Sequence, residues 1–150
     1  MTANERAVAE VLSAYNQALN ASDTSPVMPL YAKDGVFMPP YSSSAVGLVD
    51  VRKAYDAVFG AIKLTVKFNV AEIVEISPEW VFARTNSEGT TLNRATGATS
   101  KEANQELFIF HKEEDGKFKI ARYSFSTTNA QKALVPRVTF IHAGTDPDLC

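Results

Sequence analysis

The sequence predicts one α+β domain in which the helices come first and an antiparallel sheet follows. Apolar residues recur at helical spacing in the N-terminal part, and from Ile62 onward they alternate with polar residues. A further observation is Asp115-Gly116, which joins two runs rich in Phe, Ile and Tyr. Because glycine adopts the positive φ of a tight turn, this dipeptide predicts a β-hairpin. Helices followed by strands favour a curved antiparallel sheet with the helices on one face.

Three helices are expected before the sheet. Asn4 is the predicted N-cap of the first, which carries a single apolar stripe. A short second helix is expected after Pro26, since proline is tolerated in a first helical turn. Gly60 is the predicted C-cap of the third helix. The expected ranges are 4 to about 20–23, 27–31, and 49 or 50 to 59.

Turn residues separate the strand-like runs. Lys33-Asp34-Gly35 is expected to form a turn before a short strand that Pro39-Pro40 ends. In the run that begins at Trp80, small residues including Ser87 form one face, which we expect to pack against bulky groups. Asn86 lies on the other face, where it either reaches a ligand or faces solvent or a second subunit. The expected strands are 36–38, 62–76, 80–92, 103–112 and 117–127, with a polar loop over 93–100.

Several strands are apolar on both faces, as in the run 107–110. One face can pack against the helices, so we expect the other to meet a second subunit and predict a homodimer through the sheet. Residues 1–128 make up the predicted domain, and 129–150 form a C-terminal extension. Within the extension, 135–141 has strand character but contains a proline that confines it to a sheet edge, and the last residues are expected to be frayed.

Composition argues against several classes of function. The formal net charge is −2 and the Lys and Arg residues are scattered, so no nucleic-acid surface is expected. No apolar run approaches the roughly 20 residues of a membrane span, and the N-terminus lacks the charged-then-apolar order of a signal peptide. We therefore expect a cytoplasmic protein without membrane contact. His111 and His142 have no further His or Cys at ligand spacing, and Cys150 is the only cysteine, so no metal site is expected.

Four motifs follow one another in a recognisable order. They are Ala7-Val8 with Tyr15 on the first helix, the run 30–40 (LYAKDGVFMPP), Gly47 before the third helix, and the run 115–121 (DGKFKIA) in the last hairpin. Together they resemble the SnoaL-like, nuclear transport factor 2-like superfamily over residues 7–128. The resemblance implies a cone of strongly curved sheet closed by three helices, with an internal pocket and commonly a dimer. The superfamily includes cofactor-free isomerases, polyketide cyclases, epoxide hydrolases, dehydratases, and transport and assembly modules, so fold alone does not fix the function.

Ketosteroid isomerase, a member of this superfamily, uses an Asp base and an oxyanion hole made of a Tyr and a protonated Asp. Tyr15 matches the Tyr of that family's first helix in spacing. Pro39 stands where the family carries its catalytic Asp, and proline cannot accept a proton. Phe108 and Phe110 occupy hairpin positions where the second acid is wanted. Ketosteroid-type isomerisation is therefore not expected.

The last hairpin offers a carboxylate and a guanidinium as candidate catalytic groups. With a three-residue loop over 114–116, Glu106 lies diagonal to Arg122 on the same aromatic face as Phe108. Inside a cone, Arg122 would anchor a carboxylate or an enolate and Glu106 would act as a base. Alternatively, the two form a structural ion pair, and a register slip of one residue would turn both outward. Tyr15 is the third candidate, either as a pocket donor or as a core tyrosine whose hydroxyl bonds to backbone.

The leading hypothesis is a cofactor-independent enzyme that acts on a small hydrophobic, carbonyl-bearing metabolite by proton transfer, such as isomerisation, cyclisation or dehydration. The alternative is a non-catalytic dimer that binds a small ligand or assembles other subunits. An apolar wall with a few polar groups is typical of small-molecule pockets. The residues expected to contact the ligand are Tyr31, Met38, Tyr41, Asn86, Asn104 and Phe108.

Overall fold

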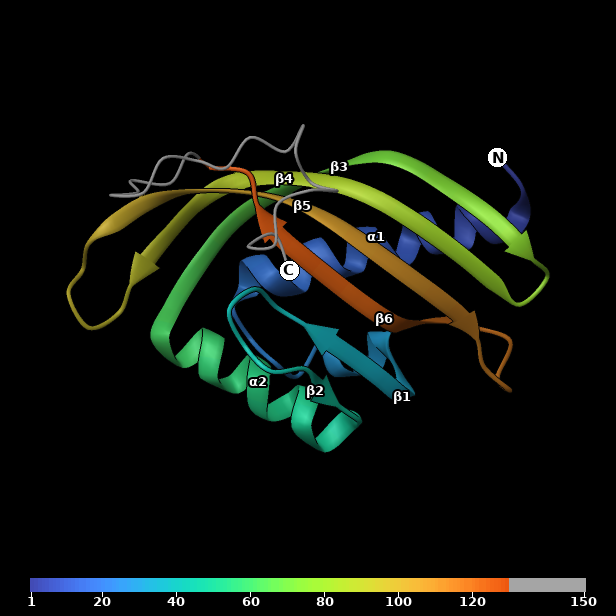
Figure 1. The fold of residues 1–150 in the computed structure, drawn as a ribbon, viewed down its shortest axis with the longest axis horizontal. Helices are drawn as coiled ribbons and strands as arrows, with labels where there is room; N and C mark the ends of the chain where they lie inside the picture. The colour runs from blue at the N-terminus through green and yellow to red at the C-terminus, as the bar shows by residue number, and fades with distance from the viewer. Residues whose placement is uncertain (130–150) are drawn as a thin grey trace, which may run out of the picture.

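The computed structural model describes residues 1–129 and contains two α-helices, one short 3-10 helix and six strands (Figure 1). The elements are α1 (Ala3–Ala21), η1 (Met28–Leu30), β1 (Tyr31–Met38), β2 (Ala45–Val46), α2 (Leu48–Ala61), β3 (Ile62–Ser77), β4 (Trp80–Asn93), β5 (Thr99–Lys112) and β6 (Phe118–Thr127). The α+β class and the four long strands of the second half are confirmed. The predicted extension lies almost wholly outside the described residues, and so does its expected strand over 135–141.

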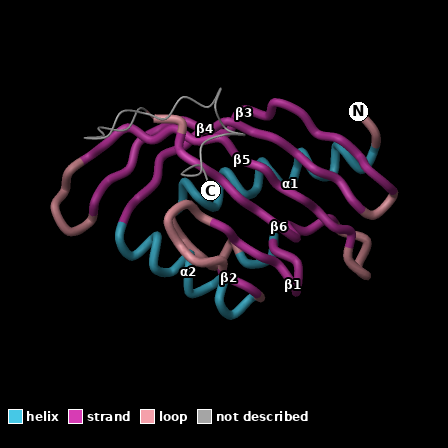
Figure 2. Tube along the Cα trace, in the orientation of Figure 1, coloured by secondary structure: helices cyan, strands magenta, loops and turns pink. Residues whose placement is uncertain are grey.

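All six strands form one sheet in the order β2-β1-β6-β5-β4-β3. β1 pairs in parallel with β6, and the other neighbours are antiparallel. Figure 2 shows the strands in magenta and the helices in cyan. Within residues 1–129 the sheet is open, because β2 and β3 form its two edges and do not pair with each other. The expectation of a closed cone of strongly curved strands is therefore not met. Both α-helices lie on the same side of the sheet, with α1 running beneath the long strands.

The expected second helix is a single 3-10 turn, Met28–Leu30, and the chain enters β1 directly after it at Tyr31. The expected turn at Lys33-Asp34-Gly35 is instead an irregular part of β1, where the pairing with β6 shifts between Tyr31 and Val36. Glycine is required at position 35, because an added Cβ would lie 2.8 Å from the Tyr31 ring. A run of turn-forming residues thus marks a strand irregularity here.

The helix ends also differ from the prediction. α1 begins two residues earlier than Asn4 suggests, because Thr2 caps it and forms a reciprocal capping box with Glu5. Gly60 is not a C-cap, since α2 continues to Ala61 and its backbone becomes extended at Ile62. The helix therefore passes directly into β3 without the left-handed residue that often ends a helix.

Polar side chains of α1 satisfy the free edge of β3. Asn16 accepts a hydrogen bond from the Phe68 amide at 3.0 Å and donates one to the Val66 carbonyl at 2.9 Å. Asn20 accepts from the Val66 amide at 2.7 Å. The helix thus covers an edge that would otherwise present unpaired backbone groups to another chain.

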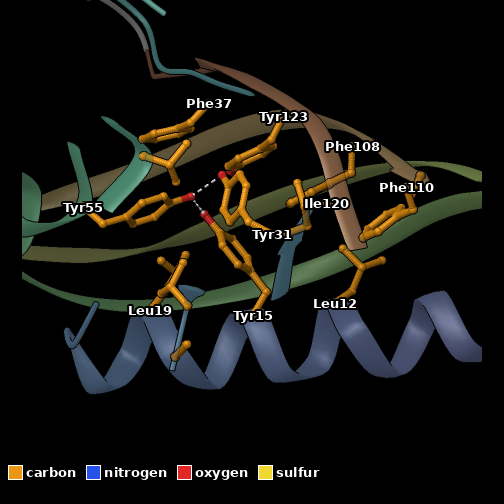
Figure 3. Packing of buried hydrophobic residues seen from close by; sticks show 14 of the residues in the cluster. Leu12, Tyr15, Leu19, Tyr31, Phe37, Tyr55, Phe108, Phe110, Ile120 and Tyr123 are labelled. Carbon is orange, nitrogen blue, oxygen red and sulfur yellow. Dashed lines mark hydrogen bonds between the residues drawn. The ribbon is translucent and has the colours of Figure 1, made fainter. Parts of the chain in front are cut away.

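The core lies between the inner face of the sheet and the two α-helices. In β4 the small residues Val81, Ala83, Thr85 and Ser87 are all buried, which confirms the prediction that this face packs against bulky groups. Aromatic rings from α1, α2, β1, β5 and β6 meet below it (Figure 3). Phe108 stacks on Tyr123 with ring centroids 4.1 Å apart.

Candidate functional site

The central hairpin begins as predicted and then departs from the predicted register. Gly116 has a φ of 78°, the Glu113 amide bonds the Lys117 carbonyl at 2.9 Å, and Phe110 lies opposite Ile120. The pairing then shifts by one residue, so that Ala121 is the extra residue of a β-bulge.

The bulge separates the two residues that were predicted to act together. Arg122 lies opposite Ile109, and Glu106 lies opposite Phe125, so the two side chains are on different faces of the sheet. The Arg122 guanidinium donates to the backbone carbonyl of Asp34 at 3.0 Å. The predicted pairing of Glu106 with Arg122 is therefore wrong, because one extra residue reverses every side chain that follows it.

A cavity of about 120 Å³ lies between the inner face of the sheet and the helices. Its wall is mainly apolar, and its polar groups come from β4, from β5 and from Tyr15, Tyr55 and Tyr123. Pro39 also lines the cavity. The lining residues are Tyr15, Leu19, Phe37, Pro39, Tyr55, Val58, Ile62, Leu64, Val66, Phe68, Ser87, Glu102, Asn104, Glu106, Tyr123 and Phe125.

Three tyrosine hydroxyls form a buried hydrogen-bonded chain, which we call the tyrosine chain. The Tyr55 hydroxyl, from α2, lies 2.6 Å from that of Tyr15 and 2.7 Å from that of Tyr31 (Figure 3). Burial raises the pKa of all three phenols, so that they stay protonated donors at neutral pH. The alternative interpretation of Tyr15 predicted a hydroxyl bonded to backbone, whereas its observed partner is the Tyr55 hydroxyl.

Glu106 is 5% exposed and lies on the inner face of β5. Its carboxylate accepts hydrogen bonds from the hydroxyls of Thr85, at 2.5 Å, and Ser87, both on β4. Burial raises the pKa of Glu106, and the neighbouring Glu102 charge raises it further, while the two hydroxyl bonds lower it. The net direction is upward, which brings this carboxyl closer to the range in which a base exchanges protons near neutral pH.

Asn104 is 7% exposed and lines the cavity beside Glu106. Its amide nitrogen donates to the Glu102 carboxylate at 2.8 Å. Glu102, Asn104 and Glu106 alternate with outward residues along β5, so the three polar side chains follow one another on the same face.

The other predicted ligand contacts lie away from the cavity wall. Phe108 is fully buried and does not line the cavity. Tyr31 does not line it either and is connected to it only through its hydrogen bond to Tyr55, which does. Asn86 is exposed on the outer face of β4, because it alternates with the inward Thr85 and Ser87. Met38 and Tyr41 are absent from the lining, and Tyr41 is 84% exposed.

Sequence analysis missed several lining residues. Tyr55 was assigned to a buried helix stripe, and nothing in helical periodicity shows that its hydroxyl joins two other tyrosines. The predicted register turns Arg122 inward and therefore turns Tyr123 and Phe125 outward, because they alternate with it along the strand. Ser87 was assigned to the correct face, and its alternation with Glu88 was the signal that placed it.

No group of three or more His, Cys, Asp or Glu within residues 1–129 is arranged to hold a metal ion. No helix in the described range is long and apolar enough to cross a membrane.

The fold agrees with that of a known family. A family model described as the SnoaL-like domain matches residues 12–123. The chain belongs to the SnoaL-like family. No curated protein matches the chain.

Solved structures that resemble this chain agree with the family assignment. A ketosteroid isomerase-like protein from Erwinia carotovora atroseptica is 32% identical, with a TM-score of 0.83 over 87% of this chain and 100% of that one. A nuclear transport factor 2-like superfamily protein from Salmonella enterica is 14% identical, with a TM-score of 0.73 over 89% and 96% of the two chains. A proposed dehydratase of the same family from Streptomyces avermitilis is 12% identical, with a TM-score of 0.69 over 85% and 98%. The last two show the fold alone.

Proposed function

We propose that this SnoaL-like protein is a cofactor-independent enzyme that moves a proton on a small, mainly apolar carbonyl compound. The observation that carries the proposal is that Glu106 and Tyr15 line the same cavity. Glu106 removes a proton from the carbon next to the carbonyl, and Tyr15 donates a hydrogen bond to the oxygen that becomes negative. Isomerisation, cyclisation and dehydration all begin with such a step.

Glu106 retains the capacity to act as a base. A carboxylate has about four acceptor positions, and the two hydroxyl bonds from Thr85 and Ser87 use two of them. The same bonds hold the side chain in one orientation, which reduces the cost of positioning it against a substrate. Because burial raises its pKa, Glu106 is a stronger base than an exposed carboxylate, and it then holds the removed proton for return to another carbon.

The tyrosine chain has one proton to offer. Three hydroxyls carry three protons, and the two hydrogen bonds of the chain use two of them. Tyr15 lines the cavity and Tyr31 does not. When Tyr31 donates to Tyr55 and Tyr55 donates to Tyr15, the Tyr15 proton is left for a ligand oxygen. A hydrogen bond that is ready before the negative charge develops is the arrangement expected of an oxyanion hole.

The test is deuterium incorporation, because it requires no knowledge of the product. The protein is incubated in D₂O with a panel of monocyclic ketones and enones, and loss of the α-proton signal is followed by NMR. We expect catalysed exchange with at least one compound and a loss of about 10²–10⁴-fold in Glu106→Gln, the usual contribution of a general base.

Glu88→Gln is the matched control, since Glu88 is an exposed carboxylate on the outer face of β4. It should exchange at the wild-type rate. Equal exchange by Glu106→Gln and the wild-type protein would remove the base assignment. The rate should also increase as the pH passes upward through the pKa of Glu106, because only the ionised carboxylate accepts a proton.

A second candidate function is a non-catalytic dimer that binds a ligand or assembles subunits. It is favoured by Pro39 at the position of a catalytic Asp and by apolar residues on the outer face of the sheet. Leu107 is 44% exposed there, opposite Arg84 and diagonal to Phe82 on β4, and Trp80 is 40% exposed farther along the same face. Exposed apolar groups of this kind mark interfaces. Light scattering should then report a dimer for the wild-type protein and a monomer for Leu107→Glu.

A further inference from the structure

The polar wall of the cavity contains hydrogen-bond acceptors in excess. Glu102, Asn104 and Glu106 form this wall, which we call the acceptor wall, on the inner face of β5. Exposure decreases along it, from the half-buried Glu102 to the buried Asn104 and Glu106. The wall therefore runs from the more open end of the cavity toward the buried tyrosines.

Asn104 presents its oxygen to the cavity. The bond from its amide nitrogen to Glu102 fixes the orientation of the side-chain amide. Its amide oxygen accepts no hydrogen bond from any residue between 1 and 129, although the side chain is more than nine-tenths buried. No buried side-chain nitrogen or oxygen within residues 1–129 lacks a partner, so this oxygen is an accessible one. Because Asn104 lines the cavity, a ligand or water there can supply the donor.

No Lys, Arg or His side chain of residues 1–129 lines this cavity. Two carboxylates therefore face the cavity without a cation of the described chain among its lining residues. An anionic ligand would be repelled, because like charges in a partly buried site interact more strongly than in water. A ligand with a hydroxyl or ammonium group would instead meet acceptors.

We infer that the ligand of this cavity is neutral or cationic and carries a hydroxyl or ammonium donor that binds Asn104 and Glu102. Neighbouring residues on one face of a strand are about 7 Å apart, so this donor lies about that distance from the atom that contacts Glu106. The identification of that atom as the reacting carbon rests on the proposed function. The preference for donors over anions does not.

Four ligands of nearly equal size test the inference: benzylammonium, benzyl alcohol, toluene and benzoate. An enclosed cavity of roughly 150 Å³ is known to accept benzene. In this cavity of about 120 Å³ the ring would fill the apolar part, and the substituent would lie toward the half-buried Glu102 at the more open end. Dissociation constants are measured at pH 7 by NMR titration of the intact protein. We expect benzylammonium and benzyl alcohol to bind at least ~10-fold more tightly than toluene, and benzoate to bind most weakly. Benzoate binding as tightly as benzylammonium, or none of the four binding, would overturn the inference.

Two variants test whether Glu102 and Asn104 cause the preference for donor ligands. Glu102→Gln keeps an oxygen that can hold the Asn104 amide, so it should fold, and it should lose most of the advantage of benzylammonium over benzyl alcohol. Asn104→Leu should reduce both to the affinity of toluene. Glu88→Gln on the outer face is the charge-matched control and should keep the wild-type order. Unchanged preferences in Glu102→Gln would place the donor elsewhere and reject the assignment.

The binding and exchange experiments separate the two proposals. Donor preference without deuterium exchange would reject the enzyme and keep the acceptor wall as a binding site. Deuterium exchange of anionic substrates, without a preference for donor ligands, would reject the acceptor wall and keep the enzyme.

Discussion

The two ends of the cavity are built from different chemistry. At the tyrosine end, phenols from α1, β1 and α2 bond to one another and are packed among aromatic rings. At the acceptor wall, two carboxylates and an amide on a single strand keep unused acceptor positions, although each Glu106 oxygen already accepts one hydrogen bond and Glu102 accepts one from Asn104. The difference indicates that the tyrosine end mainly holds the fold, and that the acceptor wall mainly selects the ligand. Variants at the first should therefore change stability more than those at the second.

The largest loss is expected from Phe108→Ala. The Phe108 ring is fully buried, stacks on Tyr123 at 4.1 Å and meets Tyr15 edge-on at 5.6 Å. Removing it should lower the free energy of unfolding by about 3–5 kcal/mol, since a cavity is left among rings that cannot collapse fully. Urea denaturation followed by far-UV circular dichroism measures the loss. A loss below ~1 kcal/mol would show that this part of the core repacks freely.

Tyr55→Phe should have the next largest effect. Tyr55 is the centre of the tyrosine chain, so the variant removes both hydrogen bonds and leaves two buried hydroxyls without their partner. We expect a loss of about 1–3 kcal/mol in the free energy of unfolding. Tyr31→Phe is the matched comparison, because it removes only one bond at the end of the chain. Equal losses in the two variants would show that the hydroxyls find other partners.

Glu106→Gln should change how stability depends on pH. The pKa of Glu106 is raised in the folded state, so the folded protein binds this proton more tightly than the unfolded chain. Its contribution to stability is complete below the unfolded value near 4.5 and is lost as the pH rises through the folded pKa. Wild-type protein should therefore lose stability relative to Glu106→Gln between about pH 4 and the folded pKa. Melting temperatures across this range, with Glu88→Gln as the charge-matched control, measure the difference. A constant offset at all pH values would contradict the raised pKa.

The difference between the acceptor wall and the tyrosine end also explains which parts of the site could be predicted from the sequence. Strict alternation in β4 and β5 assigned Glu106, Asn104 and Ser87 to the inner face, because a strand without irregularities keeps a period of two. The tyrosine end draws on four elements, and no local pattern shows which hydroxyls meet. The observed pairing of Phe110 on β5 with Ile120 on β6 fits the predicted three-residue loop over 114–116. The predicted register between these two strands fails one residue later. Ala121 has no composition that distinguishes a bulge from a regular strand residue, so Arg122 was placed on the wrong face.

Arg122→Ala should have the smallest effect on stability of these variants, and it tests the bulge directly. Arg122 lies on the outer face and donates to the Asp34 carbonyl and to the adjacent Ala121 carbonyl. Because only the Asp34 bond joins two strands, the loss of Arg122 should cost about 0.5–1.5 kcal/mol, the usual net value of one hydrogen bond. Deuterium exchange and the order of the four ligand affinities should not change, since the guanidinium does not reach the cavity. A loss of exchange comparable to that of Glu106→Gln would mean that the two side chains share a face after all. The bulge at Ala121 would then be absent in solution, and Tyr123 and Phe125 would be turned away from the cavity that they line in this structure.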